Sequence, residues 1–141
     1  MKSQRLFDIV ITILILTFLS PVFLFTMLIL RFTGEKEVFY LQDRVGFNKS
    51  PFKLFKFVTM LKNSENMGTK NLTIKDDPRI LPLGKYLRKT KLNELPQLFN
   101  VVLGDMSLIG PRPQAIDAFL LFSPKIQSSI CKVRPGLSGI G

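Results

Sequence analysis

The sequence predicts a helix-rich α+β fold, in which one apolar helix near the N-terminus precedes a small, more polar domain. Three observations support this prediction: a long uncharged run near the start, two short stretches rich in aromatic and β-branched residues, and helical patterns separated by Gly and Pro turns. We expect a membrane-embedded segment over residues 1–33 and a single functional unit over residues 34–141.

The residue composition limits the chemistry that the chain can perform. There is no His and one Cys among the 141 residues, which excludes a Ser-His triad, a disulfide framework and a Cys-rich metal site. Lys and Arg number 20 against 10 for Asp and Glu, so the formal net charge is +10. This charge favours anionic partners such as lipid headgroups, diphosphates or nucleic acid. Any catalysis must come from carboxylates, hydroxyls and basic side chains.

The run from Ile9 to Leu30 carries no charged side chain. As a helix it would be about 33 Å long, which matches a membrane hydrocarbon core of about 30 Å. A signal peptide or a buried core helix fits this run less well. Pro21, which follows Ser20 in the middle of the run, lacks an N–H and should kink the helix. Basic residues flank both ends, so charge and Pro21 leave open whether the helix crosses the membrane once or re-enters on one face.

Two stretches after the membrane segment predict a β-hairpin. The stretches Glu37–Gln42 and Pro51–Thr59 have strand composition, and turn-forming residues separate them. A short basic helix is expected over Leu83–Lys91. Near the C-terminus, Ile116–Val133 has an amphipathic pattern suited to burial or to the membrane surface, and Pro124 should break it.

The stretch from Lys91 to Pro113 has the clearest helix start and stop. Asn93 is predicted to be the N-cap because its side-chain oxygen can accept a first-turn N–H, and the helix dipole favours Glu94 beside it. Gly104 should end the helix. The apolar residues that repeat at helical spacing are Leu95, Leu98, Phe99 and Val102. A core helix without any catalytic role would show the same pattern.

The same stretch, KLNELPQLFNVVLGDMSLIGPRP, resembles the signature of the monotopic phosphoglycosyl transferases, which are bacterial sugar transferases. The segments VFYLQDRVG, KFVTM and RPGLSG are similar to further family motifs, so the likeness covers essentially the whole chain. The resemblance implies transfer of a sugar-1-phosphate from a nucleotide diphosphate sugar, expected to be a UDP-sugar, to polyprenol phosphate, expected to be undecaprenyl phosphate. This reaction is the first membrane step of polysaccharide assembly.

The resemblance also implies a location for the protein. The family has a Ser-Pro break in a re-entrant membrane helix, and Ser20 and Pro21 match it. We therefore expect both helix ends at the cytoplasmic face of the bacterial inner membrane, with the transferase domain facing the cytoplasm. Arg5 and Asp8 would then lie at the membrane interface. Relatives usually continue beyond the RPGLSG motif, so we expect this chain to be short at its C-terminus.

A magnesium and diphosphate site is expected around Asn93 and Glu94. Cleavage of a sugar diphosphate requires neutralisation of the leaving nucleotide, and Mg²⁺ supplies this through one or two carboxylates plus substrate phosphates. Glu94 is the expected catalytic carboxylate and metal ligand. The resemblance marks Arg88 as a phosphate-binding position, and the guanidinium of Arg112 would add a second positive charge. The site-shaping residues that hold Arg112 rigidly are Pro111 and Pro113.

The sequence departs from the family at Asn93, which stands where the family has its nucleophilic Asp. In the family's two-step reaction that Asp attacks the β-phosphate, and polyprenol phosphate then attacks the phosphosugar-enzyme. An amide is a poor nucleophile, so three accounts stay open. In a natural subgroup, Glu94 or direct attack by the lipid phosphate takes over; the Asn is an engineered replacement that traps the enzyme; or the protein is an inactive relative.

Two functions from other classes also stay open. The first is a non-catalytic membrane scaffold that binds lipid phosphate or nucleotide sugar. The second, suggested by the net charge alone, is membrane-tethered nucleic-acid binding, which we favour least. The sequence leaves open the sugar, the nucleotide base and whether the chain forms a homo-oligomer.

Overall fold

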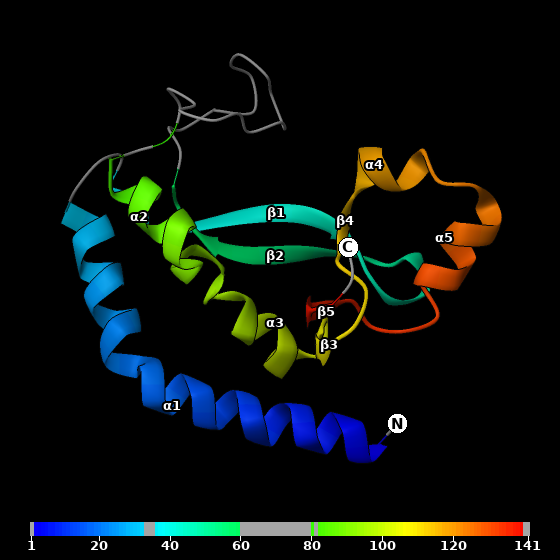
Figure 1. Ribbon diagram of the computed structural model, residues 1–141, viewed down its shortest axis with the longest axis horizontal. Coiled ribbons are helices and arrows are strands. Elements are labelled where there is room, and N and C mark those ends of the chain that lie inside the picture. Colours follow the sequence, from blue (N-terminus) through cyan, green and yellow to red (C-terminus); the bar gives the residue numbers. More distant parts are fainter. Residues whose placement is uncertain (1, 33–35, 60–79, 81, 140–141) are drawn as a thin grey trace. The chain divides into compact units, whose positions relative to one another are not determined.

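The structure is a computed structural model that describes residues 2–32, 36–59, 80 and 82–139. It confirms a helix-rich α+β fold with a long apolar N-terminal helix and a small sheet (Figure 1). The helices are α1 (Lys2–Phe32), α2 (Pro82–Thr90), α3 (Gln97–Leu103), α4 (Ile116–Leu120) and α5 (Pro124–Ile130), with short 3₁₀ turns η1 (Phe47–Lys49) and η3 (Leu92–Glu94). The strands are β1 (Phe39–Val45), β2 (Pro51–Phe57), β3 (Ser107–Ile109), β4 (Gln114–Ala115) and β5 (Gly136–Ser138).

The chain divides into two compact units. Unit 1 contains residues 1–20, 41–55 and 96–141, and unit 2 contains residues 21–40 and 56–95. The division passes through α1 between Ser20 and Pro21, so each unit contains one half of this helix.

Helix α1 continues through Pro21. Proline has no N–H to donate to the carbonyl four residues earlier, which is that of Thr17. The hydroxyl of Ser20 donates a hydrogen bond of 2.9 Å to this same carbonyl. Ser20 therefore supplies a donor where Pro21 removes one, and this matters most in a membrane, where water cannot satisfy the group.

Among the described residues, α1 is the one helix long and apolar enough to cross a membrane. Its most apolar stretch of 18 residues has a mean hydropathy of 2.6, and 17% of that stretch is buried. A core helix of a soluble protein would bury most of its apolar side chains. Those exposed along α1 are Leu6, Phe7, Val10, Ile13, Leu14, Phe18, Val22, Leu24, Phe25, Leu28 and Phe32. This surface suits lipid contact. The membrane topology and the division at residue 33 remain predictions.

The predicted β-hairpin is confirmed, with strands at Phe39–Val45 and Pro51–Phe57. Asn48 and Lys49, with φ of 55° and 62°, turn the chain between the strands, and the N–H of Gly46 bonds to the carbonyl of Ser50 at 2.8 Å. The sheet order is β2-β1-β4, in which β4 pairs antiparallel with the end of β1. Strand β2 is therefore an edge strand.

Asn100 of α3 connects this edge strand to the helix within unit 1. Its side chain is fully buried; its Oδ1 accepts the N–H of Phe55 at 3.0 Å and its Nδ2 donates to the carbonyl of Lys53 at 2.8 Å. These are backbone groups that a neighbouring strand would otherwise pair. The core beside this contact consists of Leu54, Val101 and Met106, with Phe52, Leu108 and Leu137 packed against it.

Unit 2 has an aromatic core. The rings of Phe23 and Phe57 lie 5.1 Å apart, and Phe39 stacks on Phe57 at 5.8 Å. Such pairs contribute about 0.5–1.5 kcal/mol beyond their burial. Leu30 and Leu87 complete the buried cluster, so the C-terminal half of α1 packs with α2 and the start of the hairpin.

The helix predicted to start at Asn93 begins instead at Gln97, and its N-cap is Pro96. Asn93 lies inside the 3₁₀ turn η3, so the N-cap prediction was wrong. The predicted end at Gly104 is confirmed, with φ of 101°. The apolar face was also partly wrong, because Phe99 and Val102 are each 37% exposed. The buried residues of α3 are Gln97, Leu98, Asn100 and Val101. Asn100 lies on the buried face because its side chain bonds to the backbone of β2.

The amphipathic segment near the C-terminus is broken at Pro124, as predicted. Helix α4 ends at Leu120, and Pro124 takes the first position of α5, where it costs little because the N–H would be unpaired. The side chain of Ser123 caps α5 by accepting the N–H of Ile126 at 3.4 Å.

Replacement of Asn100 by Ala tests its structural role. The variant would leave the backbone groups of Lys53 and Phe55 without their partner, so the free energy of unfolding should fall by about 2–4 kcal/mol. The measurement is thermal or denaturant unfolding in detergent. Ser128→Ala, at an exposed site on α5, is the control and should change stability by less than about 0.5 kcal/mol. An Asn100→Ala protein as stable as this control would contradict the role.

Candidate functional site

The predicted site residues fall in both units. Arg88, Asn93 and Glu94 belong to unit 2, whereas Pro111, Arg112 and Pro113 belong to unit 1.

In unit 2, Lys91 places Asn93 and Glu94 in their turn. Lys91 has a left-handed backbone with φ of 65°, which is uncommon for a residue other than Gly and costs about 1–2 kcal/mol. Its N–H bonds to the carbonyl of Arg88 at 3.3 Å, and its carbonyl accepts the N–H of Glu94 at 3.1 Å. The chain thus leaves α2 and reverses into η3. Strained backbone of this kind is concentrated at functional sites.

The side-chain oxygen of Asn93 is buried and has no hydrogen-bond partner in the part of the chain that the structure describes. An unpaired buried acceptor costs about 1–3 kcal/mol, so a bound donor or cation would stabilise this position. Amide and carboxylate oxygens are ligands that Mg²⁺ and similar hard cations accept. Asn93 and the adjacent Glu94 therefore fit a divalent metal.

Within residues 2–32, 36–59, 80 and 82–139, no group of three or more His, Cys, Asp or Glu side chains could hold a metal. A cation at Asn93 and Glu94 could take further ligands from substrate. Mg²⁺ commonly binds in this way, through one or two carboxylates, several waters and substrate phosphates.

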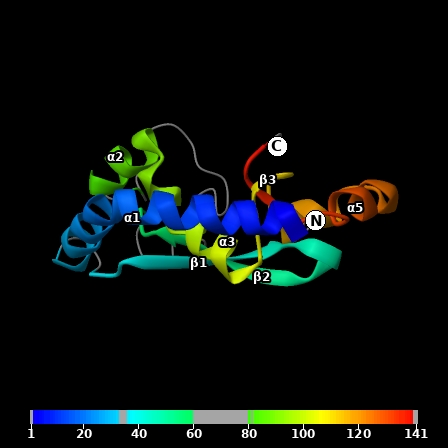
Figure 2. The ribbon, with the colours of Figure 1, turned by 90° about the horizontal axis from the view of Figure 1, so that it is seen from below.

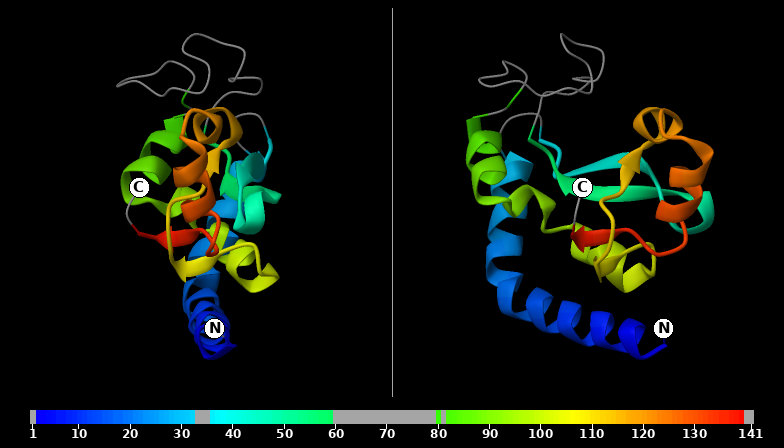
Figure 3. Two further views of the ribbon diagram at one scale, coloured as in Figure 1. Left: turned by 90° about the vertical axis from the view of Figure 1, so that its right-hand side faces the viewer. Right: turned by 45° about the vertical axis from the view of Figure 1, so that its right-hand side comes forward.

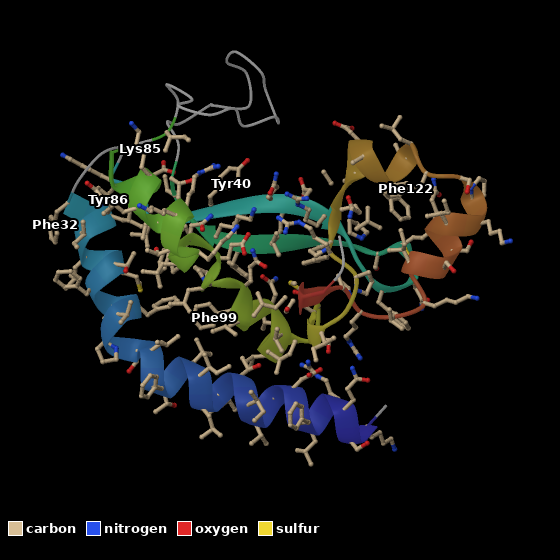
Figure 4. All side chains as sticks on the ribbon, in the orientation of Figure 1. Phe32, Tyr40, Lys85, Tyr86, Phe99 and Phe122 are labelled. Carbon is tan, nitrogen blue, oxygen red and sulfur yellow. The ribbon has the colours of Figure 1, made fainter. Side chains whose placement is uncertain are left out.

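Arg88 is held by its contact with Thr59, because its Nε donates to the buried Thr59 Oγ1 at 2.9 Å. Gly84 permits this approach of α2, since a Cβ there would collide with the backbone of Thr59. Lys85 and Tyr86 lie on the exposed side of α2 (Figure 4). The orientation of the Arg88 guanidinium is therefore set by packing within unit 2.

In unit 1, hydrogen bonds hold the backbone on both sides of Arg112. The carbonyl of Pro111 accepts the N–H of Gly136 at 2.8 Å, and the carbonyl of Pro113 accepts Nη1 of Arg44 at 3.2 Å. The two prolines also fix their own φ angles. The exposed Arg112 side chain thus projects from a rigid turn. Sequence reasoning missed Arg44, although it lies in the family-like segment VFYLQDRVG.

The residues directly before GPRP form a short parallel pair with the RPGLSG segment, and this pair was not predicted from the sequence. Ser107 of β3 pairs with Gly136 of β5, and Ile109 pairs with Ser138 (yellow and red in Figure 3). A Cβ on Gly136 would lie 2.6 Å from the Cα of Gly110, so only Gly permits this approach. The glycines in both motifs were the one feature of the sequence that could have indicated this close approach of the two backbones.

The first turns of α1 contact the start of this pair in unit 1, where α1 runs across α3 (Figure 2). Asp8 is 4% exposed, and its Oδ2 accepts the hydroxyl of Ser107 at 2.5 Å. Arg5 donates to the carbonyl of Val102 at 2.9 Å, at the C-terminal end of α3, where a positive charge is favourable. Sequence reasoning expected Arg5 and Asp8 at the membrane interface and missed these contacts.

Comparison with known proteins shows the family. The profile of the bacterial sugar transferases matches residues 1–141. The exopolysaccharide production protein ExoY of Sinorhizobium fredii is 37% identical over 98% of this chain and 67% of its own length. The sugar transferase EpsL of Bacillus subtilis, of uncharacterized function, is 40% identical over 99% of this chain and 67% of its own length.

A third relative carries the name of a reaction. It is the UDP-glucose:undecaprenyl-phosphate glucose-1-phosphate transferase of Klebsiella pneumoniae, 38% identical over 99% of this chain. The chain spans 30% of that longer protein. Phosphotransfer of this type generally needs a divalent metal, and the oxygens of Asn93 and Glu94 suit one.

Gly136→Ala tests the close approach of β3 and β5. The added methyl would collide with the backbone of Gly110, so we expect the thermal unfolding midpoint to fall by the equivalent of about 3 kcal/mol or more. Gly46→Ala is the milder comparison, because its methyl would meet the ring of Phe52 at 3.0 Å and the carbonyl oxygen of Ser50 at 3.2 Å, rather than backbone atoms below 3 Å. Equal stability of the two variants would show that the two glycine motifs do not pack as described.

Proposed function

Because the chain belongs to the bacterial sugar transferase family, we propose that it transfers a sugar-1-phosphate from a UDP-sugar to undecaprenyl phosphate or a similar polyprenol phosphate. The observation that carries this proposal is the family match over the whole chain, together with the buried Asn93 oxygen, which has no partner among the described residues and lies beside the Glu94 carboxylate in sequence. The Klebsiella pneumoniae relative is named for this type of transfer. The reaction would begin the assembly of a polysaccharide on a membrane lipid.

Glu94 is the proposed ligand of Mg²⁺, with the Asn93 amide oxygen as a second. When bound, Mg²⁺ neutralises charge on the leaving nucleotide. Arg88, fixed by Thr59, supplies positive charge from the same unit. Arg112 is a second proposed phosphate ligand, and its rigid turn supports this role because it reduces the entropy lost on binding.

We assign α1 as a re-entrant helix that places the transferase domain on the cytoplasmic face of the bacterial inner membrane. The exposed apolar surface of α1 supports membrane insertion, and Pro21 with the Ser20 hydroxyl supports a break in the middle. Basic residues near both ends of the run fit a helix whose two ends lie on the same face.

The alternative of a non-catalytic scaffold has no support from the comparisons, since the family is one of transferases. Nucleic-acid binding likewise has none. The net charge of +10 is accounted for by anionic lipid and diphosphate partners.

The test is release of UMP from a panel of UDP-sugars, beginning with UDP-glucose, by detergent-solubilised protein with Mg²⁺ and undecaprenyl phosphate. We expect lipid-dependent release by the parent, reduced about 100-fold or more in Glu94→Gln because the metal loses its carboxylate. Asn93→Asp is run in parallel. If the parent releases no UMP from any UDP-sugar, the proposed function is wrong for this chain; release by Asn93→Asp alone would then show a site that lacks only its nucleophile.

Arg112→Ala should lower kcat/KM for the UDP-sugar by about 10- to 100-fold, the effect of one charge-assisted hydrogen bond. Arg112→Lys should recover part of the loss, because Lys keeps the charge but not the guanidinium fork. Lys125→Ala, which removes an exposed positive charge from α5, is the control and should leave kcat/KM within about twofold of the parent. Equal kinetics for Arg112→Ala and this control would exclude Arg112 from phosphate binding.

A further inference from the structure

We propose that this protein transfers the phosphosugar in one step, by direct attack of the polyprenol phosphate on the UDP-sugar, without a phosphosugar-enzyme intermediate. The inference rests on the proposed function and concerns the mechanism at the same site. The observation behind it is the amide at position 93, whose oxygen is buried and unpartnered among the described residues.

The amide of Asn93 cannot serve as the attacking group. It carries no negative charge at neutral pH, and attack through its oxygen would create an unstable phosphorylated imidate. In the described part of unit 2 the carboxylates are Glu37 and Glu94, there is no Cys or Ser, and the hydroxyl groups are those of Thr and Tyr, which are weak nucleophiles without an activating base. Glu94 is the proposed metal ligand, a role that lowers its nucleophilicity because the cation withdraws its electron density.

The acceptor is already a suitable nucleophile. A phosphate monoester has a second pKa of about 6, so at neutral pH the lipid phosphate is largely a dianion whose oxygens are nucleophilic. A neutral amide at position 93 also repels this dianion less than a carboxylate would. Asn93 therefore offers no nucleophile of its own, and its lack of charge favours binding of the lipid phosphate that attacks instead.

The atoms and electrons balance in a single displacement. An oxygen of the lipid phosphate attacks the β-phosphorus of the UDP-sugar, and a new P–O bond forms. The bond from the β-phosphorus to the oxygen shared with the α-phosphate breaks, and its electron pair leaves on UMP. The products are UMP and a polyprenyl diphosphate sugar, and no proton transfer is required.

Asn93 then has a binding role in this step. Its Nδ2 can donate to an oxygen of the transferring phosphoryl group, while its buried Oδ1, which has no partner among the described residues, could accept from a bound cation or donor. The amide holds the phosphoryl group for in-line attack rather than bonding to it covalently.

The experiment is isotope exchange without the lipid acceptor. Parent protein is incubated with a UDP-sugar that it turns over, radiolabelled UMP and Mg²⁺, and label entering the UDP-sugar is measured. An enzyme intermediate produces exchange, whereas a single displacement does not. We expect parent exchange at background, at least about 100-fold below the lipid-dependent rate. Asn93→Asp, which restores a nucleophilic carboxylate, is the positive control and should exchange.

Intact-mass and peptide analysis of the parent after incubation with UDP-sugar alone gives a second readout. The proposal expects no phosphosugar adduct on any peptide, and Asn93→Ala should still turn over, about 10- to 100-fold more slowly, because only a hydrogen-bonding group is lost. Parent exchange without lipid, or an adduct on Glu94 or elsewhere, would overturn the proposal. So would a parent that is silent where Asn93→Asp turns over, and that result would also contradict the proposed function for this chain, whereas parent exchange without lipid or an adduct would overturn only the single-step mechanism. Silence of both proteins overturns the proposed function and this inference with it.

Discussion

The side-chain amide of Asn100 holds the edge of strand β2 in unit 1, and the neighbouring elements are arranged around this contact. The amide pairs with the backbone of Lys53 and Phe55 on the open edge of the sheet. The carbonyl of Asn100 also accepts the N–H groups that follow the helix, from Gly104, Asp105 and Met106. One buried residue therefore fixes α3 against the sheet and sets where the helix ends.

The elements that follow Asn100 lead directly to the turn at Arg112. Met106 enters the core, and Ser107 starts β3, which pairs with β5 and contacts Asp8 on α1. The chain then enters the turn whose carbonyls are held by Gly136 and Arg44. Each contact limits the backbone of the next segment, so the position of Arg112 within unit 1 depends on a continuous set of hydrogen bonds rather than on its prolines alone.

In unit 2 the corresponding constraint is the reversal at Lys91. A left-handed residue between α2 and η3 brings Asn93 into a turn where its oxygen is buried. A helix N-cap would have used that oxygen to accept a backbone N–H. In the 3₁₀ turn that oxygen has no partner within the part of the chain that the structure describes, so the same side chain can bind a ligand.

The sequence by itself determined the elements whose causes are local. The apolar run predicted α1, two stretches rich in aromatic and β-branched residues with turn residues between them predicted the hairpin, Gly104 ended α3, and Pro124 divided the C-terminal segment. Each of these acts within a few residues through hydrophobic periodicity, turn chemistry or the missing N–H of proline. The motif resemblance likewise indicated the family and the candidate residues Arg88, Asn93, Glu94 and Arg112.

Only the tertiary structure decided which polar residues are buried and what they contact. Asn100 and Gln97 are buried because of tertiary packing, which for Asn100 includes hydrogen bonds to the backbone of a distant strand. Helical spacing alone had predicted burial of Phe99 and Val102. The pairing of β3 with β5 and the contact of Asp8 with Ser107 join residues far apart in sequence. Such contacts depend on chain segments that no local pattern can bring together, and for this reason the surroundings of Arg112 and the burial of the Asn93 oxygen emerged from the fold.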